Sequence, residues 1–488
     1  MLKQTRELCD QCRTTIFNGH MVCRSCGFSV CIECFTFRNK NFSSNDNNKH
    51  KDKDRYMWPY CGKYDPDSQK ITKLHHIPNE FIYVQFIPPY IIKKLNWSFQ
   101  SYMDSIKNLE RFDKKKFSPD FLTIDSYSEN IRVSDEELTK IFEMYWHSKT
   151  PIVIKNINKN LDMNLWTPDS FSNEFGHLEI DLIDCRKNAI VKKASLKKFW
   201  DGFENLNERF VDEKSRPLIL KLKDWPTTDD FKNLLPARYE DLMKNLPIKK
   251  FTHRSGVFNL ASSLPDFFSV PDLGPKLYIA YSSADTPKEG TTNLHVDISD
   301  AVNLMIYVGK DLTSGKNNEM LKILNESKCN DEQINRFKID GERPGALWHI
   351  FKPDQADLIR SYLTIRNIEK GKKIKDQTDP IHDQLNYIDN KMLIELKENY
   401  NVEVYTIIQF LGDAIFIPSG APHQVRNLNS CIKVAGDFVT PQGVQDCLII
   451  TNQFRDLSER HANHQDKLQV KNIIYHSIKK CLSILNCP

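Results

Sequence analysis

The sequence lacks the long apolar run that a membrane-spanning helix requires. Such a helix needs about 20 mostly apolar residues, and no stretch of the 488-residue chain reaches about 18. The chain starts with MLKQTRELCDQC, which contains neither the apolar segment nor the small-residue cleavage site of a secretory signal. We therefore expect a protein without transmembrane helices that stays in a reducing compartment.

The chain also has little net charge and no visible internal repeat. Its 68 Lys and Arg residues against 64 Asp and Glu residues leave a net charge of +4, which permits a local basic patch at most. Hydrophobic residues make up 40% and charged residues 27%, as in a globular protein with a sizeable core. The length indicates two to four folding units.

Cysteine is concentrated at the N-terminus. Of 13 cysteines, seven lie in the first 61 residues, as three CxxC pairs and a single residue: Cys9/Cys12, Cys23/Cys26, Cys31/Cys34 and Cys61. In a reducing compartment such clusters are metal ligands more often than disulfides. A CxxC turn suits two corners of a tetrahedral zinc site, so the cluster predicts bound zinc.

Two closed zinc sites need eight ligands, and the cysteines supply seven. We choose His75 as the eighth, with His76 and His50 as alternatives. An interleaved arrangement would join the first and third CxxC pairs in one site. The second pair, Cys61 and the histidine would then form the other, but the sequence leaves this pairing open. We expect the zinc to fold a module that has little core of its own.

Downstream, the sequence predicts a mixed, β-rich fold. A helix is expected from Ser134, which forms a capping-box pattern with Glu137. The later apolar runs are short, rich in β-branched and aromatic residues, and bounded by turn residues: PIVIKNI, IDLIDC, LILKL, KLYIAY, AVNLMIYVG, ALWHIF, TIIQFLGDAIFIP and CIKVAGDFV. Such runs, with helices between them, are typical of a barrel or jelly roll.

Two of these segments carry a candidate metal site. His295 and Asp297 are two residues apart on an expected strand, so their side chains point to the same face. His423 follows a second strand and a Pro-Ser-Gly turn. Two histidines and a carboxylate form the facial triad of Fe(II) oxygenases, which leaves positions open for ligands. Spacing alone is weak evidence, because a chain with 14 histidines produces such pairs by chance.

Longer segments around these residues resemble the JmjC oxygenases, and most closely the JMJD1 subgroup, the KDM3-type histone lysine demethylases related to the hairless protein. The segments are GTTNLHVDISDAVN, DPIHDQ, QFLGDAIFIPSGAPHQVRNLNSCIKVAGDFV and DKLQVKNIIYH. The similarity runs from about Leu161 to Leu485. The pattern CDQC…CRSCGFSVCIEC resembles the subgroup's C6-type zinc finger. The resemblance implies a double-stranded β-helix, the cupin-like JmjC barrel, with flanking helices and a small zinc-binding module.

With this resemblance we divide the chain into five parts. They are a zinc-binding module (1–80), an irregular connector (81–130), a helical and β region (131–231), the JmjC catalytic barrel (232–456) and a helical C-terminal segment (457–488).

The resemblance also implies roles for individual residues. His295, Asp297 and His423 match the iron ligands. Thr292 matches a threonine that contacts the distal carboxylate of 2-oxoglutarate, and Asn303 matches an asparagine near that cosubstrate.

The cation that faces the distal carboxylate is less directly matched. Many JmjC proteins have a lysine where this chain has Ala346, and a buried carboxylate still needs a positive partner. We choose Lys433, with Lys310 as the second candidate. Tyr278 matches a tyrosine beside the methylated ammonium in some relatives, with simple core packing as the alternative. Trp348 is expected in the core beside the cosubstrate.

The implied function is an Fe(II)- and 2-oxoglutarate-dependent demethylase that hydroxylates N-methyl groups on mono- or dimethylated lysine 9 of histone H3. Its expected partners are the histone tail, chromatin and transcription co-regulators in the nucleus, with a homodimer also allowed. A protein side-chain hydroxylase and a catalytically silent scaffold are the alternatives. Two departures bear on targeting and the site: a divergent, short connector, and Gly436 where the subgroup usually has Glu.

Overall fold

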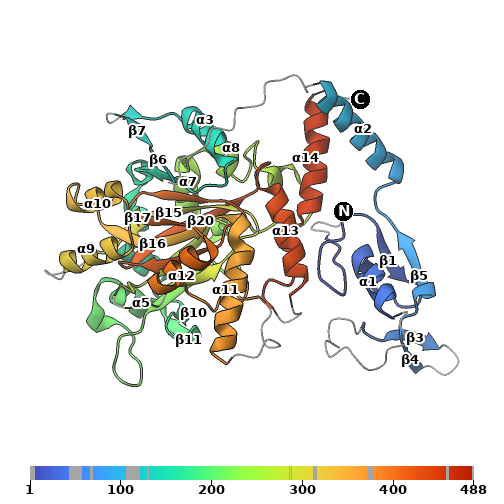
Figure 1. Cartoon of the computed structure of the whole chain (residues 1–488), viewed down its shortest axis with the longest axis horizontal. Coiled ribbons are helices and arrows are strands. Elements are labelled where there is room, and N and C mark those ends of the chain that lie inside the picture. Colours follow the sequence, from blue (N-terminus) through green and yellow to red (C-terminus); the bar gives the residue numbers. More distant parts are fainter. Residues whose placement is uncertain are drawn as a thin grey trace. The chain divides into compact units, whose positions relative to one another are not determined.

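The computed structural model describes residues 6–42, 58–65, 70–105, 121–128, 131–284, 286, 288, 290–310, 316–371, 379–457 and 461–485. The chain forms two compact units (Figure 1). The barrel unit consists of Lys115–Asn259 and Leu273–Asp446, and the terminal unit consists of Met1–Lys114, Leu260–Asp272 and Cys447–Pro488.

Two sheets form the centre of the barrel unit. Within its described residues, the larger sheet has the strand order β11-β10-β12-β13-β20-β15-β18-β9-β6 and the smaller has the order β14-β19-β16-β17. In that order, the larger sheet comprises Ala189–Ser195, Glu179–Asp184, Leu220–Trp225, Lys276–Ala280, Cys431–Phe438, Asp300–Val308, Ala414–Ile417, Ile152–Lys155 and Leu122–Asp125. The smaller comprises Thr292–His295, His423–Asn427, Pro344–Phe351 and Val404–Phe410. A short hairpin joins β7 (Tyr127–Ser128) to β8 (Ile131–Arg132).

Alternating side chains give the larger sheet two different faces. On the outer face, Leu277, Leu304 and Val434 belong to a core shared with the flanking helices. On the inner face, Met305 packs in a second core with residues of the smaller sheet, among them Trp348. The two sheets therefore face each other, which confirms the predicted β-rich, jelly-roll architecture with flanking helices.

Helices flank these sheets. They are α3 (Asp135–Trp146), α4 (Pro168–Phe175), α5 (Leu196–Glu204), α6 (Phe231–Leu234), α7 (Pro236–Asn245), α8 (Lys249–Thr252), α9 (Lys316–Glu326), α10 (Asp331–Lys338), α11 (Ala356–Glu369) and α12 (Asn390–Tyr400). The predicted start of α3 is confirmed, because the Ser134 side chain accepts a hydrogen bond from the Glu137 amide at 3.2 Å. Leu138 and Phe142, four residues apart, are among the buried residues of this helix.

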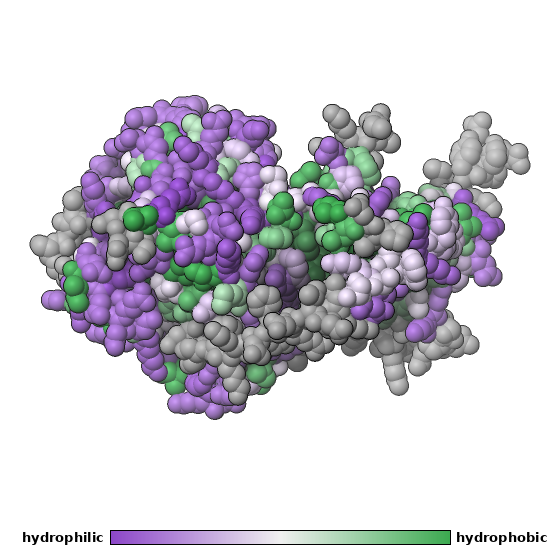
Figure 2. All heavy atoms as spheres, turned by 90° about the horizontal axis from the view of Figure 1, so that it is seen from above, coloured by the Kyte–Doolittle hydropathy of each residue, from purple (hydrophilic) through white to green (hydrophobic). Residues whose placement is uncertain are grey.

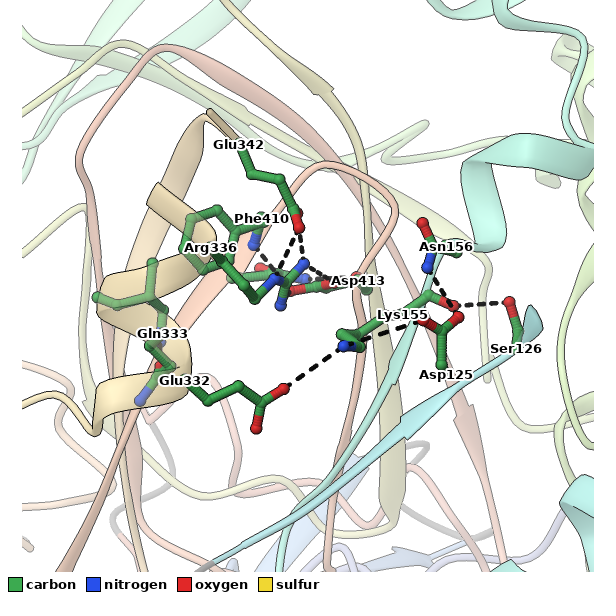
Figure 3. Close-up of polar contacts among 12 residues, drawn as sticks. Asp125, Ser126, Lys155, Asn156, Glu332, Gln333, Arg336, Glu342, Phe410 and Asp413 are labelled. Atoms are coloured by element: carbon green, nitrogen blue, oxygen red, sulfur yellow. Dashed lines mark hydrogen bonds and ion pairs between the residues drawn. The ribbon is translucent and has the colours of Figure 1, made fainter. Parts of the chain in front are cut away.

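Helix α10 packs on β17, the edge strand of the smaller sheet, and Figure 3 shows Gln333 and Arg336 on this helix. The Gln333 amide donates to the Thr406 carbonyl at 3.2 Å and accepts from the Ile408 amide, so it satisfies backbone groups of the edge strand β17. Arg336 forms two 2.9 Å hydrogen bonds with the buried Asp413 carboxylate, which lies in the turn between β17 and β18. These backbone groups of β17 are therefore not available for pairing with another strand.

The terminal unit combines the two ends of the chain. It contains a sheet of order β2-β1-β5 (Ser29–Cys31, His20–Cys23 and Phe81–Val84), a hairpin of β3 (Cys61–Asp65) and β4 (Lys70–Leu74), and four α-helices among its described residues. These helices are α1 (Ile32–Phe42), α2 (Pro89–Ser105), α14 (Val470–Ile484) and most of α13 (Val444–Arg455).

The structure corrects the prediction of irregular structure from residue 81. Phe81–Val84 pair with four residues of β1, and Pro89–Ser105 form a 17-residue helix. A proline at the first helical position costs nothing, since its missing N–H would have no helical partner there. The helix expected near the C-terminus is present as α14.

Hydrophilic residues cover most of the barrel unit's face in Figure 2, and hydrophobic residues appear there in scattered spots. This agrees with the burial of its apolar side chains in the cores on both faces of the larger sheet. No helix among the described residues is long and apolar enough to cross a membrane.

Candidate active site and metal centres

His295, Asp297 and His423 converge at one end of the smaller sheet. His295 ends β14 and His423 begins β19, and the two are direct partners in the antiparallel register. The Asp297 carboxylate lies 3.9 Å from Nε2 of His295 and 3.5 Å from Nε2 of His423. The turn before His423 is held close because the Gly420 amide donates to the Asp297 carbonyl at 3.1 Å.

Backbone carbonyls orient both imidazoles. Nδ1 of His295 lies 2.9 Å from the Asn293 carbonyl, and Nδ1 of His423 lies 3.0 Å from the Ala421 carbonyl. Because a carbonyl oxygen only accepts, each Nδ1 carries the proton and each Nε2 lone pair is left for a metal. Burial, with the neighbouring His423, lowers the pKa of His295 to about 3, so its imidazole is neutral near pH 7.

Lys433 places a buried positive charge on the inner face of β20. Its side chain is 5% exposed, and Nζ donates to Oδ1 of Asn427 at 2.8 Å and lies 5.7 Å from the centre of the Trp348 ring. Burial lowers the pKa of this ammonium group. No ion pair joins it to a carboxylate among the described residues, so it could bind an anionic ligand. Lys310, by contrast, is exposed after β15, where its backbone amide donates to Glu204.

The other predicted cosubstrate residues lie on the same inner surface. Asn303 is buried on β15, and Nε2 of Gln409 donates to its carbonyl at 2.9 Å. Oε1 of Gln409 in turn accepts from Nε1 of Trp348 at 2.9 Å. The Trp348 ring is stacked near His423, with 6.0 Å between ring centres. Thr292 is half-buried on β14, three residues before the first histidine.

Tyr278 lies opposite Lys433 in the register of β13 and β20, and it is half-buried. Burial and the nearby carboxylates of Asp224, Asp437 and Asp297 raise the pKa of its hydroxyl well above the usual value. Asp224 belongs to an irregular part of β12 and has a φ of +58°. An aromatic ring among carboxylates is a suitable environment for a cationic group.

Sequence reasoning missed three polar residues of this surface, namely Asn427, Gln409 and Lys221. Lys221 is mostly buried, and its Nζ donates to the Thr291 carbonyl at 2.7 Å. Lys221 in LILKL and Gln409 in TIIQF each stand between apolar residues, and Asn427 in HQVRN comes four residues after His423. The period of two along a strand could therefore have indicated that these side chains point inward with the predicted metal ligands.

The N-terminal cysteines form two groups in the terminal unit, each with its potential ligand atoms within 4.8 Å of one another. The first group is Cys9, Cys12, Cys31 and Cys34, and the second is Cys23, Cys26, Cys61 and His76. The geometry therefore brings the interleaved pairs together. Four thiolates, or three with one imidazole, are donor sets of closed structural zinc sites.

The structure corrects the choice of His75 as the eighth residue. Nε2 of His76 lies 3.2 Å from Sγ of Cys26, and its ring stacks on Phe28 at 4.7 Å. His75 is exposed and its ring packs against Tyr60. Only one of two adjacent side chains leaving β4 can turn inward, and here it is that of His76. His50 lies outside the described residues.

Comparisons with known proteins agree with this fold and site. The sequence model described as "JmjC domain, hydroxylase" matches residues 329–438, so this region is a JmjC domain. Lysine-specific demethylase 3 of Drosophila melanogaster is 35% identical over 603 aligned positions, which cover 99% of this chain and 70% of that protein. The chain belongs to the family of lysine-specific demethylase 3, which confirms the resemblance read from its motifs.

Two human relatives match equal shares of the chain. Lysine-specific demethylase 3A of Homo sapiens is 46% identical over 350 residues, 71% of this chain and 26% of that protein. The human "Probable JmjC domain-containing histone demethylation protein 2C" is 43% identical over 350 residues, 71% of this chain and 14% of that protein. The chain thus matches about a quarter or less of the length of these relatives.

Proposed function

We propose that this chain is an Fe(II)- and 2-oxoglutarate-dependent histone demethylase. The observation that carries the proposal is the convergence of His295, Asp297 and His423 in a barrel that also buries an ammonium group. That group, on Lys433, lies 5.7 Å from the Trp348 ring and has no carboxylate partner among the described residues. The names of the relatives, lysine-specific demethylases and a histone demethylation protein, support the substrate class.

The residues fit the metal and the cosubstrate in chemical type. His295 and His423 offer neutral Nε2 atoms, and Asp297 offers a carboxylate between them. Fe(II) held by this triad, with 2-oxoglutarate and O₂, would supply the oxidation of an N-methyl group, whose carbon leaves as formaldehyde.

The chain's own part is to bind and orient. Lys433 would neutralise the distal carboxylate of 2-oxoglutarate, because burial makes an ion pair there strong. Asn427 already accepts a hydrogen bond from its Nζ and so fixes the direction of the ammonium group. Thr292 and Asn303 would contact the cosubstrate from β14 and β15, where Gln409 holds Asn303 in place.

We propose mono- and dimethylated lysine 9 of histone H3 as the substrate, with the methylammonium group bound beside Tyr278. The carboxylates of Asp224 and Asp437 near this ring favour a cation over a neutral side chain. The same proposal includes action on chromatin in the nucleus, binding of transcription co-regulators and formation of a homodimer.

The two cysteine groups would hold zinc that folds the N-terminal module. The first site would consist of Cys9, Cys12, Cys31 and Cys34, and the second of Cys23, Cys26, Cys61 and His76.

A panel of methylated histone peptides tests this function. The purified chain, loaded with Fe(II) and 2-oxoglutarate, should release formaldehyde with peptides methylated at lysine 9 of histone H3. His423→Ala should abolish the release while leaving the circular dichroism spectrum intact. If the wild-type chain forms neither succinate nor formaldehyde with any peptide, the demethylase proposal fails and the scaffold alternative replaces it.

A further inference from the structure

Arg455 contacts the four-cysteine group from the far end of the sequence. It is the last residue of α13, and its Nη2 donates to Sγ of Cys34 at 3.5 Å, across 421 positions of the chain. A guanidinium stays protonated in proteins, so its hydrogen bond to a thiolate ligand is charge-assisted. The contact is thus electrostatically favourable as well as close.

The two cysteine groups need different amounts of charge compensation. Four thiolates around one Zn²⁺ carry a formal charge of −2, whereas three thiolates and a neutral imidazole carry −1. In the second group, the nearby Arg38 donates to the His76 carbonyl at 3.1 Å and stacks on Trp58 at 4.0 Å. The arginine that hydrogen-bonds directly to a sulfur therefore serves the more negative group.

The contact also falls on the most accessible thiol of its group. Cys9, Cys12 and Cys31 are at most 9% exposed, whereas Cys34 is half-buried. A reagent or chelator reaches the half-buried sulfur first. A charge-assisted hydrogen bond to a ligand atom stabilises the thiolate and makes it a weaker nucleophile.

Other C-terminal residues surround the same group in the terminal unit. Asp466 accepts a hydrogen bond from the Thr15 amide at 3.2 Å, and Lys471 of α14 lies 3.5 Å from the Glu33 carboxylate. The ring of Tyr475 packs on Phe17 with 5.5 Å between centres. The segment after the barrel is thus fastened to the residues that flank the first cysteine pair and the third.

We propose that Arg455 is a positioning residue of the four-cysteine zinc site. It offsets part of the site's negative charge, holds Cys34 as a ligand, and so slows the loss of zinc while joining the end of α13 to the N-terminal module. This proposal rests on the assignment of zinc to this group and is independent of the demethylase activity.

Zinc release from the full chain tests the proposal. The chain is prepared with two zinc ions, and their transfer to the chromogenic chelator 4-(2-pyridylazo)resorcinol is followed in wild type, Arg455→Met, Arg455→Lys and Lys471→Gln. Arg455→Met should release one of the two ions about tenfold faster, since loss of a partner of a metal ligand weakens binding by roughly 10- to 100-fold. Arg455→Lys should restore most of the slow release.

Lys471→Gln is the matched control. It removes one positive charge from the same neighbourhood, but Lys471 pairs with Glu33 and not with a thiol. Its release rate should equal that of wild type. Alkylation by iodoacetamide, read by peptide mass spectrometry, should rise at Cys34 in Arg455→Met and stay unchanged at Cys23 and Cys61.

Three results would overturn the proposal. The first is wild-type release and alkylation rates in a folded Arg455→Met protein. The second is zinc release that is as fast in Lys471→Gln as in Arg455→Met, which would show that the loss of any positive charge near the site accelerates release. The third is an Arg455→Lys protein that loses zinc no more slowly than Arg455→Met. If Arg455→Met does not fold, Arg455→Gln takes its place in each comparison. If the wild-type chain binds no zinc, the proposal also fails, because its premise is absent. The formaldehyde assay is independent of this result and would still test the demethylase proposal.

Discussion

Replacing Lys433 by methionine tests how the site binds the cosubstrate. Lys433 is 5% exposed and its ammonium group donates a hydrogen bond to Asn427 at 2.8 Å, so a carboxylate bound beside it would form a desolvated charge pair. Truncating one partner of such a pair costs about 2–5 kcal/mol, which corresponds to a rise in KM for 2-oxoglutarate of roughly 30-fold or more. The assay is succinate formation by the iron-loaded protein over a range of 2-oxoglutarate concentrations.

The same variant has a structural readout and a control. Lys433 has no carboxylate partner among the described residues, so methionine removes a buried charge without leaving another one unpaired. The thermal midpoint and the iron content should therefore be preserved. Lys310→Met, on an exposed side chain, should leave KM unchanged. An unaltered KM in iron-loaded Lys433→Met, or a raised KM in Lys310→Met, would refute the assignment.

Three further predictions concern zinc, stability and pH. His76→Ala should lower the zinc content from two ions to about one per chain by elemental analysis, while His75→Ala keeps both, because only His76 lies with the second cysteine group. Arg336→Met should lower the free energy of unfolding by about 3–5 kcal/mol in urea titrations, because it leaves Asp413 unpaired in the interior. Burial lowers the pKa of His349 to about 3 in the folded chain, whereas a histidine in the unfolded chain has a pKa of about 6.5. As the pH falls, the unfolded chain therefore takes up a proton at His349 before the folded chain does. The free energy of unfolding should therefore rise with pH between about 3 and 6.5, by at most about 1.4 kcal/mol per pH unit from this group, and level off above that range. His349→Gln should reduce this slope in urea titrations between about pH 5 and 7.

Each of these predictions has a contrasting result. Two zinc ions in His76→Ala would remove this histidine from the ligand set. Lys155→Met breaks two partly exposed pairs, with Glu332 at 3.4 Å and with Asp125 at 3.9 Å (Figure 3), so its cost should stay at about 1 kcal/mol or less. A cost as large as that of Arg336→Met would contradict the argument from burial. An unchanged slope in His349→Gln would show that this histidine does not titrate on unfolding.

The convergence of His295, Asp297 and His423 could be predicted from the sequence because the spacing of these residues and their chemistry indicate the same kind of site. His295 and Asp297 are two residues apart, so the period of a strand predicted that their side chains lie together. The strand in fact ends at His295, and the carboxylate of Asp297 just beyond it lies 3.9 Å from Nε2 of His295. Lys433 stood out because an apolar residue was expected at its position, and the structure shows it buried. The residue types and the two-residue repeat of side chains along a strand were therefore enough to predict a site that is built from one or two strands.

The remaining features depend on contacts between distant segments. Nothing local distinguishes His75 from His76, and only the fold of the chain after β4 turns one of them toward Cys26. Helix α2 was missed because residues 81–130 were predicted to form an irregular connector, whereas Pro89 occupies the first position of a helix. The contact of Arg455 with Cys34 spans 421 positions, a distance over which residue patterns give no information.

The mass of the product peptide tests the central claim most directly. The iron-loaded chain is incubated with 2-oxoglutarate, O₂ and a histone H3 peptide dimethylated at lysine 9, and the peptide is then analysed by mass spectrometry. The proposed function predicts successive losses of the mass of one CH₂ group, which depend on His295, Asp297 and His423. A stable gain of the mass of one oxygen atom would instead identify a side-chain hydroxylase, and an unchanged peptide mass would contradict catalysis on this substrate.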